Sequence, residues 1–456
     1  MRQLERFAAT GWHNTRTDAA LLVKQLRKLH PKFTEERCSR FALHTALYGK
    51  KPFRDLWMRQ LCTIVLKIAE AYLKTIAMEQ HSVMAEVGLM QAYRERGLQK
   101  HFDGALRRAQ SLQADSAVHD IDHFHRQYLL ESERTLMREA QKSRDPEADL
   151  QGVANNLDVF YLARKLKLAV QMTTDATIYG REFEQPLVPE LLEHLAQQGA
   201  PHPLVELYHS ALLTLQHPDA EHYFFILKRL LENHQEVLTP EEAADLHTVA
   251  RNFAIRQANR GRAADFLPEL FGLYQLALDR DILLDQQGYM PSSVFKNIVA
   301  LGLALQHLEW VHHFLTSFGD TLRPAEQADT LNYNQAKLQF AQGSYRDVVR
   351  LLRDTEYDNV FVAIDARCLL AKTWYELQEL DALESLLDSF ATLIRRQQHL
   401  GYHAENYLNM IRFTRQLIRI GGTDPKALQA LRISVESEPV LTEKTWLLAK
   451  IDAAGS

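Results

Sequence analysis

Apolar residues recur at spacings of three and four residues along almost the whole chain, which is the pattern of amphipathic helices. A clear short example is DAALLVKQLRKLH, whose apolar face consists of Ala19, Leu22, Leu26 and Leu29. The sequence holds no run of alternating apolar residues bounded by hairpin turns, which a sheet would require. Its 18 glycines and 14 prolines are fewer than average usage predicts, and this also favours long helices. We therefore predict an all-α protein.

The periodicity also predicts where individual helices lie. The expected ranges are 56–78, 82–113, 117–143, 150–172, 184–198, 203–216, 219–234, 240–259 and 263–280. Clusters of glycine, proline and polar residues predict loops at 142–152, 197–203 and 421–424.

Charge is distributed unevenly along the 456 residues. The whole chain has a net charge of −5, which gives no overall nucleic-acid footprint. Residues 1–60 nevertheless contain 13 Lys and Arg against 5 Asp and Glu. Such a basic end can contact nucleic acid, an acidic partner or the acidic remainder of its own chain.

One pattern recurs at nearly fixed intervals in the second half of the chain. The stretch LNYNQAKLQFAQGSYRDVVRLL runs from Leu331 to Leu352. Its second part aligns with 303–315 at an offset of 37 residues and with 375–387 at an offset of 35. The segment 258–270 fits the same alignment further upstream. Offsets close to 34 residues indicate a repeated unit of two helices, with Gly343 at the turn between them.

The stretch around Gly343 resembles a tetratricopeptide repeat. The matching positions are Tyr333, Asn334, Ala336, Gly343, Tyr345 and Val348. Segments such as YGKKPFRDLWMRQL and NNLDVFYLARKLKLA also make the chain similar to a group of uncharacterised bacterial tetratricopeptide-like proteins, a resemblance that implies architecture only. It implies a right-handed α-α superhelix, or solenoid, with an N-terminal helical capping region.

The resemblance also implies a division of the chain. Residues 1–80 would form a basic helical region, 81–200 degenerate helical hairpins, 201–420 the tetratricopeptide-like repeats and 421–456 the C-terminal capping helices. Small residues such as Ala336 and Ala371 would lie where the two helices of a repeat approach closely.

Polar and basic residues recur where this family lines its concave groove. The candidate groove residues are Arg251, Asn252, Arg256, Lys296, Asn297, Tyr333, Asn334, Lys337 and Lys372. They would receive an acidic peptide or a C-terminal carboxylate, and Arg260 and Arg262 would add to the same basic surface. The alternative is that these residues are solvated or form ion pairs between repeats. The expected function is a non-enzymatic scaffold that binds a protein or peptide.

A second function class is a regulator that binds nucleic acid through its N-terminal region. Residues 37–73 read as helix, short turn and helix, and Lys51, Arg54 and Arg59 would contact phosphates. In the competing interpretation these helices cap the solenoid, with Trp57, Leu61 and Leu66 in a core.

A third class is a metal-binding protein. The segment DSAVHDIDHFHRQ places His119 and His123 four residues apart, with Asp115 and Asp122 nearby, and such ligands suit zinc or iron. The alternative is a polar helix face.

The remaining signals point away from catalysis and from membranes. The chain has no GxSxG, GxxxxGK[ST] or GxGxxG motif, so neither an enzyme nor a cofactor is expected. Cys38, Cys62 and Cys368 read as buried reduced thiols of a cytoplasmic protein. The most apolar run, LCTIVLKIAEAYL, is interrupted by Lys67 and Glu70 and is too short to span a bilayer.

Overall fold

The computed structural model describes residues 1–80, 82–115, 118–141, 150–234, 236–353, 355, 357, 360–396, 403–421 and 424–455. These residues form helices and connecting turns, and no strand occurs among them, so the all-α prediction is confirmed. The chain folds into two compact units. Unit 1 consists of Met1–Gln216 and Asn233–Thr239, and unit 2 consists of His217–Glu232 and Pro240–Ser456. The division at residues 80, 200 and 420 stays a prediction.

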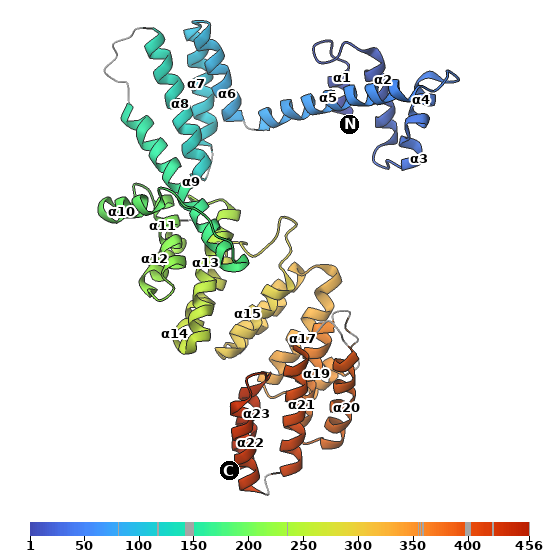
Figure 1. Cartoon of the computed structure of the whole chain (residues 1–456), viewed down its shortest axis with the longest axis vertical. Helices are drawn as coiled ribbons and strands as arrows, with labels where there is room; N and C mark the ends of the chain where they lie inside the picture. Colours follow the sequence, from blue (N-terminus) through green and yellow to red (C-terminus); the bar gives the residue numbers. More distant parts are fainter. Residues whose placement is uncertain are drawn as a thin grey trace. The chain divides into compact units, whose positions relative to one another are not determined.

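Unit 1 contains the first eleven α-helices. Their bounds are α1 (Arg2–Ala8), α2 (Thr17–Leu29), α3 (Glu35–Cys38), α4 (Arg40–Tyr48), α5 (Asp55–Gln80), α6 (Ser82–Glu95), α7 (Gln99–Ala114), α8 (Ile121–Ala140), α9 (Leu150–Tyr179), α10 (Val188–Gln198) and α11 (Pro203–Gln216). Figure 1 shows α6, α7 and α8 side by side within this unit, in agreement with their mutual packing.

Unit 2 contains the helices from α12 onward, apart from Asn233 at the end of α12. Their bounds are α12 (Glu221–Asn233), α13 (Pro240–Gln257), η1 (Ala258–Arg262), α14 (Ala263–Leu278), α15 (Ser292–Ala304), α16 (Leu308–Phe318), η2 (Gly319–Thr321), α17 (Pro324–Ala341), α18 (Tyr345–Leu352), α19 (Val360–Glu376), α20 (Leu380–Arg396), α21 (His403–Ile420), α22 (Pro425–Ser437) and α23 (Lys444–Ala454).

Helix starts follow from local sequence chemistry. Proline is the first residue of α11, α13, α17 and α22, where its missing N–H has no partner to lose and its φ is already helical. The carboxylate of Asp120 accepts the N–H of His123 and begins α8, and Asp424 likewise accepts the N–H groups of Lys426 and Ala427. These signals explain why most helix boundaries lie within a few residues of their predicted positions.

One predicted helix is wrong. The range 82–113 is two antiparallel helices, α6 and α7, which reverse at Gly97. Gly97 has φ +65°, and the N–H of Leu98 donates to the carbonyl of Tyr93 at 2.9 Å, which closes α6. The apolar periodicity continues through the turn and conceals it, so Gly97 is the only local signal.

The predicted loops agree only in part with the structure, since residues 150–152 of the range 142–152 are helical and begin α9. The loop at 197–203 is confirmed, since α10 ends at Gln198 and α11 begins at Pro203. Residues 142–149 of the loop at 142–152 lie outside the described residues, and so do 422–423 of the loop at 421–424.

The aligned turns in unit 2 share one backbone geometry. Gln306, Gly343 and Gln378 occupy equivalent positions of the sequence alignment and have φ of +60°, +75° and +59°. At each turn the next residue donates its N–H to the carbonyl five residues earlier, at 2.9, 2.9 and 3.1 Å. This pair of a left-handed residue and a 6→1 hydrogen bond is a Schellman helix end. The register found in the sequence therefore marks real helix–helix turns.

Exchanging glycine and glutamine between two of these turns tests whether they share one backbone geometry. A left-handed residue other than glycine costs about 1 kcal/mol, because its Cβ crowds the backbone. A Cβ on Gly343 would meet no atom within 4 Å, so its cost would be purely conformational. We expect Gly343→Gln to lower the free energy of unfolding by about 1 kcal/mol and Gln378→Gly to raise it by a similar amount. Urea titration of both variants measures the two changes, and equal signs would contradict the shared geometry.

Small residues lie at the helix crossings of unit 2. Ala336 and Ala371 are completely buried, as predicted. A Cβ built on Gly302 of α15 would lie 2.5 Å from Cγ2 of Val311 on α16. The side chain of Val311 therefore packs directly on the backbone of Gly302. The α15–α16 hairpin is thus closely packed at a small residue.

The cores of unit 2 follow one another along the chain. One cluster joins α17, α18 and α19 around Ala336 and Val348, and the next joins α19, α20 and α21 around Leu383 and Phe390. A third joins α21, α22 and α23 around Val435. Each cluster shares a helix with the next, so successive hairpins stabilise their neighbours.

The N-terminal helices of unit 1 have a core of their own. Buried residues from α1, α2, α4 and α5 pack together, including Leu22, Met58 and Leu61, and Trp57 is partly buried against them. Leu66 is 58% exposed, so its predicted core position is wrong. Among the described helices, none combines the length and apolarity needed to cross a membrane.

The three cysteines all carry free thiols. Cys368 is buried, as predicted, but Cys38 and Cys62 are only partly buried.

Candidate functional site

The nine candidate groove residues lie on four helices of unit 2. Arg251, Asn252 and Arg256 are on α13, Lys296 and Asn297 on α15, Tyr333, Asn334 and Lys337 on α17, and Lys372 on α19. They separate into a group around Tyr274 and a group around Lys337.

The first group connects α13, α14 and α15. The guanidinium of Arg251 lies 5.3 Å above the ring of Tyr274, and Asn297 forms a side-chain hydrogen bond with the Tyr274 hydroxyl. Burial lowers the pKa of Arg251 and raises that of Tyr274. Arg251 is thus partly engaged within its own unit. Asn252 is exposed and Arg256 is half-buried.

The second group forms a partly buried polar cluster between α15, α17, α19, α21 and the start of α23, in which Lys372 is the buried member. We call it the inner polar cluster, and its members are Lys296, Tyr333, Lys337, Asp365, Lys372, Tyr407 and Glu443.

Two strong polar contacts lie within the inner polar cluster. The hydroxyl of Tyr407 donates to Oδ1 of Asp365 at 2.6 Å, and Nζ of Lys372 lies 2.7 Å from Oε2 of Glu443. Burial raises the pKa of Tyr407, and the carboxylate of Asp365 raises it further. Burial likewise raises the pKa of Tyr333. These phenols therefore act as neutral hydrogen-bonding groups.

Lys337 differs from the other groups of the cluster. Among the described residues its ammonium has no ion pair or hydrogen bond, and it lies 5.7 Å from the centroid of the Tyr333 ring. Burial lowers the pKa of Lys337; Asp365 and Glu443 oppose this shift, and Lys372 and Lys296 add to it. A partly buried cation of this kind is stabilised by an anion that approaches it.

Lys337 and Lys372 occupy equivalent positions, 35 residues apart, in the aligned repeats. Glu443 of the same chain supplies the carboxylate for Lys372, and no described residue supplies one for Lys337. Lys372 is thus closed to a partner in this structure. The cation at Lys337 remains available.

Lys296 lines a cavity of about 280 Å³. The other lining residues are Ser292, Ala325, Glu326, Asp329, Thr330 and Val362. In the described part of the chain the Lys296 ammonium forms no ion pair, and it is close enough to Lys337 to lower the pKa of that residue. Two unpaired lysines therefore face the same region of unit 2.

The recurring asparagines do not share one environment. Asn252 is exposed, and Asn297 bonds to Tyr274. Asn334 is completely buried, and its Nδ2 donates to the carbonyl of Thr330 at 2.7 Å. The position of a residue in the sequence alignment does not distinguish these environments, because the packing of neighbouring helices decides which side chain is covered.

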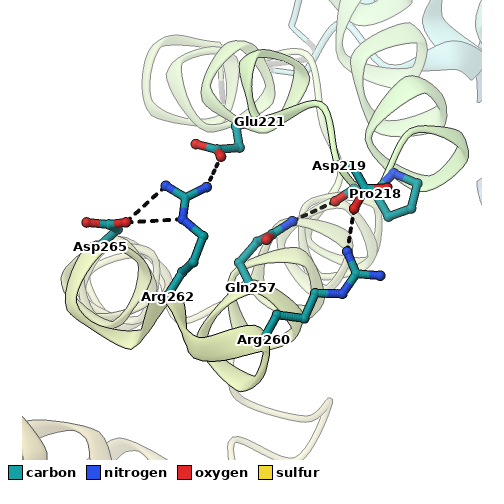
Figure 2. A network of polar contacts seen from close by, with 7 residues as sticks. All are labelled: Pro218, Asp219, Glu221, Gln257, Arg260, Arg262 and Asp265. Atoms are coloured by element: carbon teal, nitrogen blue, oxygen red, sulfur yellow. Dashed lines mark hydrogen bonds and ion pairs between the residues drawn. The ribbon is translucent and has the colours of Figure 1, made fainter.

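The arginines of the turn after α13 contact the preceding hairpin. Arg260 pairs with Asp219, and Arg262 pairs with Glu221 and Asp265, as Figure 2 shows. Nearby, Nε2 of the buried Gln257 donates to the carbonyl of Pro218 at 2.6 Å. These contacts fasten η1 to the start of α12. Arg260 and Arg262 therefore brace two hairpins.

The N-terminal basic residues are partly paired. Lys51 and Arg54 are exposed. Arg59 lies 2.7 Å from Asp55, which also pairs with Arg40 at 3.1 Å. All three predicted phosphate contacts are therefore exposed to solvent, and Arg59 is the one of them that also forms an ion pair.

The predicted metal ligands are only partly brought together. The rings of His119 and His123 lie 4.3 Å apart, but Asp122 pairs with Arg164 and Asp115 lies at the end of α7. Across the described ranges, no group of three His, Cys, Asp or Glu side chains could hold a metal ion. His202, His234 and Glu236 join the two histidines, and the sequence carries no signal of this because more than 70 residues separate them.

The described residues of the fold and the site define an all-helical protein of packed hairpins with a partly buried cluster of charges. No family model, curated protein or solved structure matches the chain.

Proposed function

We propose that the protein is a non-enzymatic scaffold that binds an acidic segment of a partner protein. In this proposal unit 2 is a tetratricopeptide-like array, a right-handed α-α superhelix, and the region around Lys296 and Lys337 is its binding surface. The shared turn geometry and the chained cores support the array.

The observation that carries the proposal is the unpaired ammonium of Lys337. Its equivalent in the next repeat, Lys372, is satisfied by a carboxylate at 2.7 Å. A partner carboxylate placed on Lys337 would form the corresponding charge-assisted bond in a partly desolvated site, where such bonds are strong. Lys296 would add a second cation, and the cavity beside it would receive a side chain of the partner.

Binding of labelled peptides by the full-length protein tests this. The probes are fluorescein-labelled peptides with acidic C-terminal segments, each made with a free and with an amidated C-terminus. Lys337→Met keeps the apolar stem beside Tyr333 and removes the charge. We expect this variant to bind the acidic peptides at least about tenfold more weakly, equivalent to about 1.4 kcal/mol, by fluorescence anisotropy.

The matched control is Lys426→Met, which removes an exposed lysine from α22. It should bind like the unmodified protein. Equal affinity of Lys337→Met and the unmodified protein would reject the assignment, as would an absence of binding to every acidic peptide. A difference between free and amidated peptides would further show that the terminal carboxylate itself is bound.

A nucleic-acid-binding regulator remains the alternative, supported by the excess of basic residues in 1–60 and by the exposure of Lys51 and Arg54. The three free thiols support the cytoplasm as the proposed compartment.

A further inference from the structure

Four histidines from distant parts of the sequence gather in unit 1. His119 precedes α8 and His123 lies in its first turn, while His202 directly precedes α11. His234 belongs to the segment Asn233–Thr239, which is part of unit 1 although its neighbours along the chain, α12 and α13, belong to unit 2. The same segment contributes Glu236.

The segment Asn233–Thr239 is held in unit 1 by both polar and apolar groups. The backbone N–H of His119 donates to the carbonyl of Glu236 at 2.9 Å. Val237 and Leu238 are buried, with 3% and 6% of their surface exposed. Nδ1 of His234 lies 3.4 Å from Oε1 of Glu236. The cluster therefore joins this segment to the start of α8.

The surroundings of two of the imidazoles, those of His202 and His123, favour the neutral form. Nδ1 of His202 accepts the N–H of Leu204 at 3.2 Å and so caps the start of α11, which requires that nitrogen to be unprotonated. Nδ1 of His123 is buried, and no described residue offers it a hydrogen-bond partner. A proton on either nitrogen would lose a cap or add an unpaired charge in the interior.

The charged groups around the cluster do not offset protons added to His123 and His202. On α8 and its approach they are Asp120, Asp122 and Arg126, and Asp122 is already paired with Arg164 of α9. On the segment, Glu236 is the carboxylate, and on α11 Glu206 lies beside His209 instead. Gln113 of α7 bridges Arg126 and the carbonyl of His123 and carries no charge.

The electrostatics give the direction of the pH effect. Burial, with smaller contributions from His119, Arg126 and His202, lowers the pKa of His123 to about 4. Burial also lowers the pKa of His202, with His119 and His234 adding to the shift and Glu236 opposing it. The assembled cluster thus binds fewer protons than a separated one at mildly acidic pH. By linkage, acid favours separation.

We propose that this histidine cluster forms a proton-sensitive latch, in which His123 and His202 are the groups that take up protons. With neutral imidazoles the segment Asn233–Thr239 is held against the starts of α8 and α11, and proton uptake in mildly acidic solution releases it. The device is independent of the proposed binding surface, which lies in unit 2.

Hydrogen exchange of the full chain, measured by mass spectrometry at pH 7.5 and pH 5.5, tests the latch. Rates are corrected for the pH dependence of intrinsic exchange. We expect protection of the peptides covering 118–124 and 236–239 to fall at least about tenfold at the lower pH, as the bond from His119 to Glu236 opens. Unchanged corrected protection in the unmodified protein would overturn the proposal.

The decisive variant is His123→Phe with His202→Asn. Phenylalanine keeps a ring against His119, and asparagine keeps an acceptor for the N–H of Leu204, but neither takes up a proton. Protection at pH 5.5 should then remain near its value at pH 7.5. Loss of protection equal to that of the unmodified protein would refute the latch.

The matched control is His125→Phe. His125 also lies on α8, but it stacks on Phe160 at 4.5 Å and is not one of the four clustered histidines. This variant should keep the pH response of the unmodified protein. If the double variant does not fold at pH 7.5, His202→Asn alone carries the test: a smaller loss of protection than in the unmodified protein supports the latch, and an equal loss overturns it.

Discussion

Replacement of Glu443 by alanine is expected to lower the free energy of unfolding by about 3 kcal/mol. Among the described residues the ammonium of Lys372 is paired only with this carboxylate, and its side chain is 11% exposed. It lies over the rings of Phe340 and Trp446, at 4.8 and 5.9 Å, so the variant would leave a buried cation without its carboxylate. Urea titration of the full chain measures the loss.

Replacement of the other partner of this ion pair, Lys372, should lower the free energy of unfolding much less. Lys372→Met leaves Glu443, whose side chain is 35% exposed and reaches water, and methionine fits the same aromatic surroundings. We expect a cost of about 1 kcal/mol. The double variant should be more stable than Glu443→Ala alone, because it removes the stranded cation. A double variant less stable than Glu443→Ala would show that the pair is not the source of the effect.

Acid should destabilise unit 2 through His247. This side chain is 1% exposed, its Nδ1 has no hydrogen-bond partner among the described residues, and burial lowers its pKa to about 4, with Arg251 and Arg280 contributing. The unfolded chain has a histidine pKa of about 6.5. Between these values the unfolded state binds more protons, so stability falls as the pH falls.

The expected contribution of His247 is a loss of about 2 kcal/mol between pH 7 and pH 5. In His247→Leu this loss should disappear, whereas stability at pH 7 should stay similar because an unpaired buried nitrogen is replaced by carbon. The measurement is the difference in free energy of unfolding between the variant and the unmodified protein, followed across pH. His312→Asn, at an exposed position of α16, is the control. A constant difference from pH 7 to pH 5 would contradict the assignment.

The parts of the fold that could be predicted from the sequence are those set by residues close together in the chain. Prolines at helix starts and the glycine at the 343 turn act within one or two residues, so α11, α13 and the α17–α18 hairpin could be predicted from short segments. Gln306 and Gln378 show the limit of this reading, since both adopt the left-handed turn without glycine. There the helix packing on either side imposes the backbone conformation.

The apolar periodicity of a long segment does not show where the chain turns back or which side chains are exposed, because helix packing decides both. The apolar residues keep their helical spacing through the α6–α7 turn at Gly97. Leu66 has the spacing of a core residue but is exposed. Periodicity reports which residues share a helix face, and it does not report whether another helix covers that face.

The sequence by itself determined the helical class, most helix boundaries and the positions of the aligned turns at 306, 343 and 378, because these depend on neighbours a few residues apart. Only the tertiary structure decided which charges are satisfied. Lys337 and Lys372 are equivalent in sequence, yet Glu443 reaches one of them from 71 residues away and leaves the other unpaired. The histidines of the proposed latch likewise meet only through folding. Desolvation and ion pairing depend on what surrounds a side chain in space, so residue type and spacing alone do not define them.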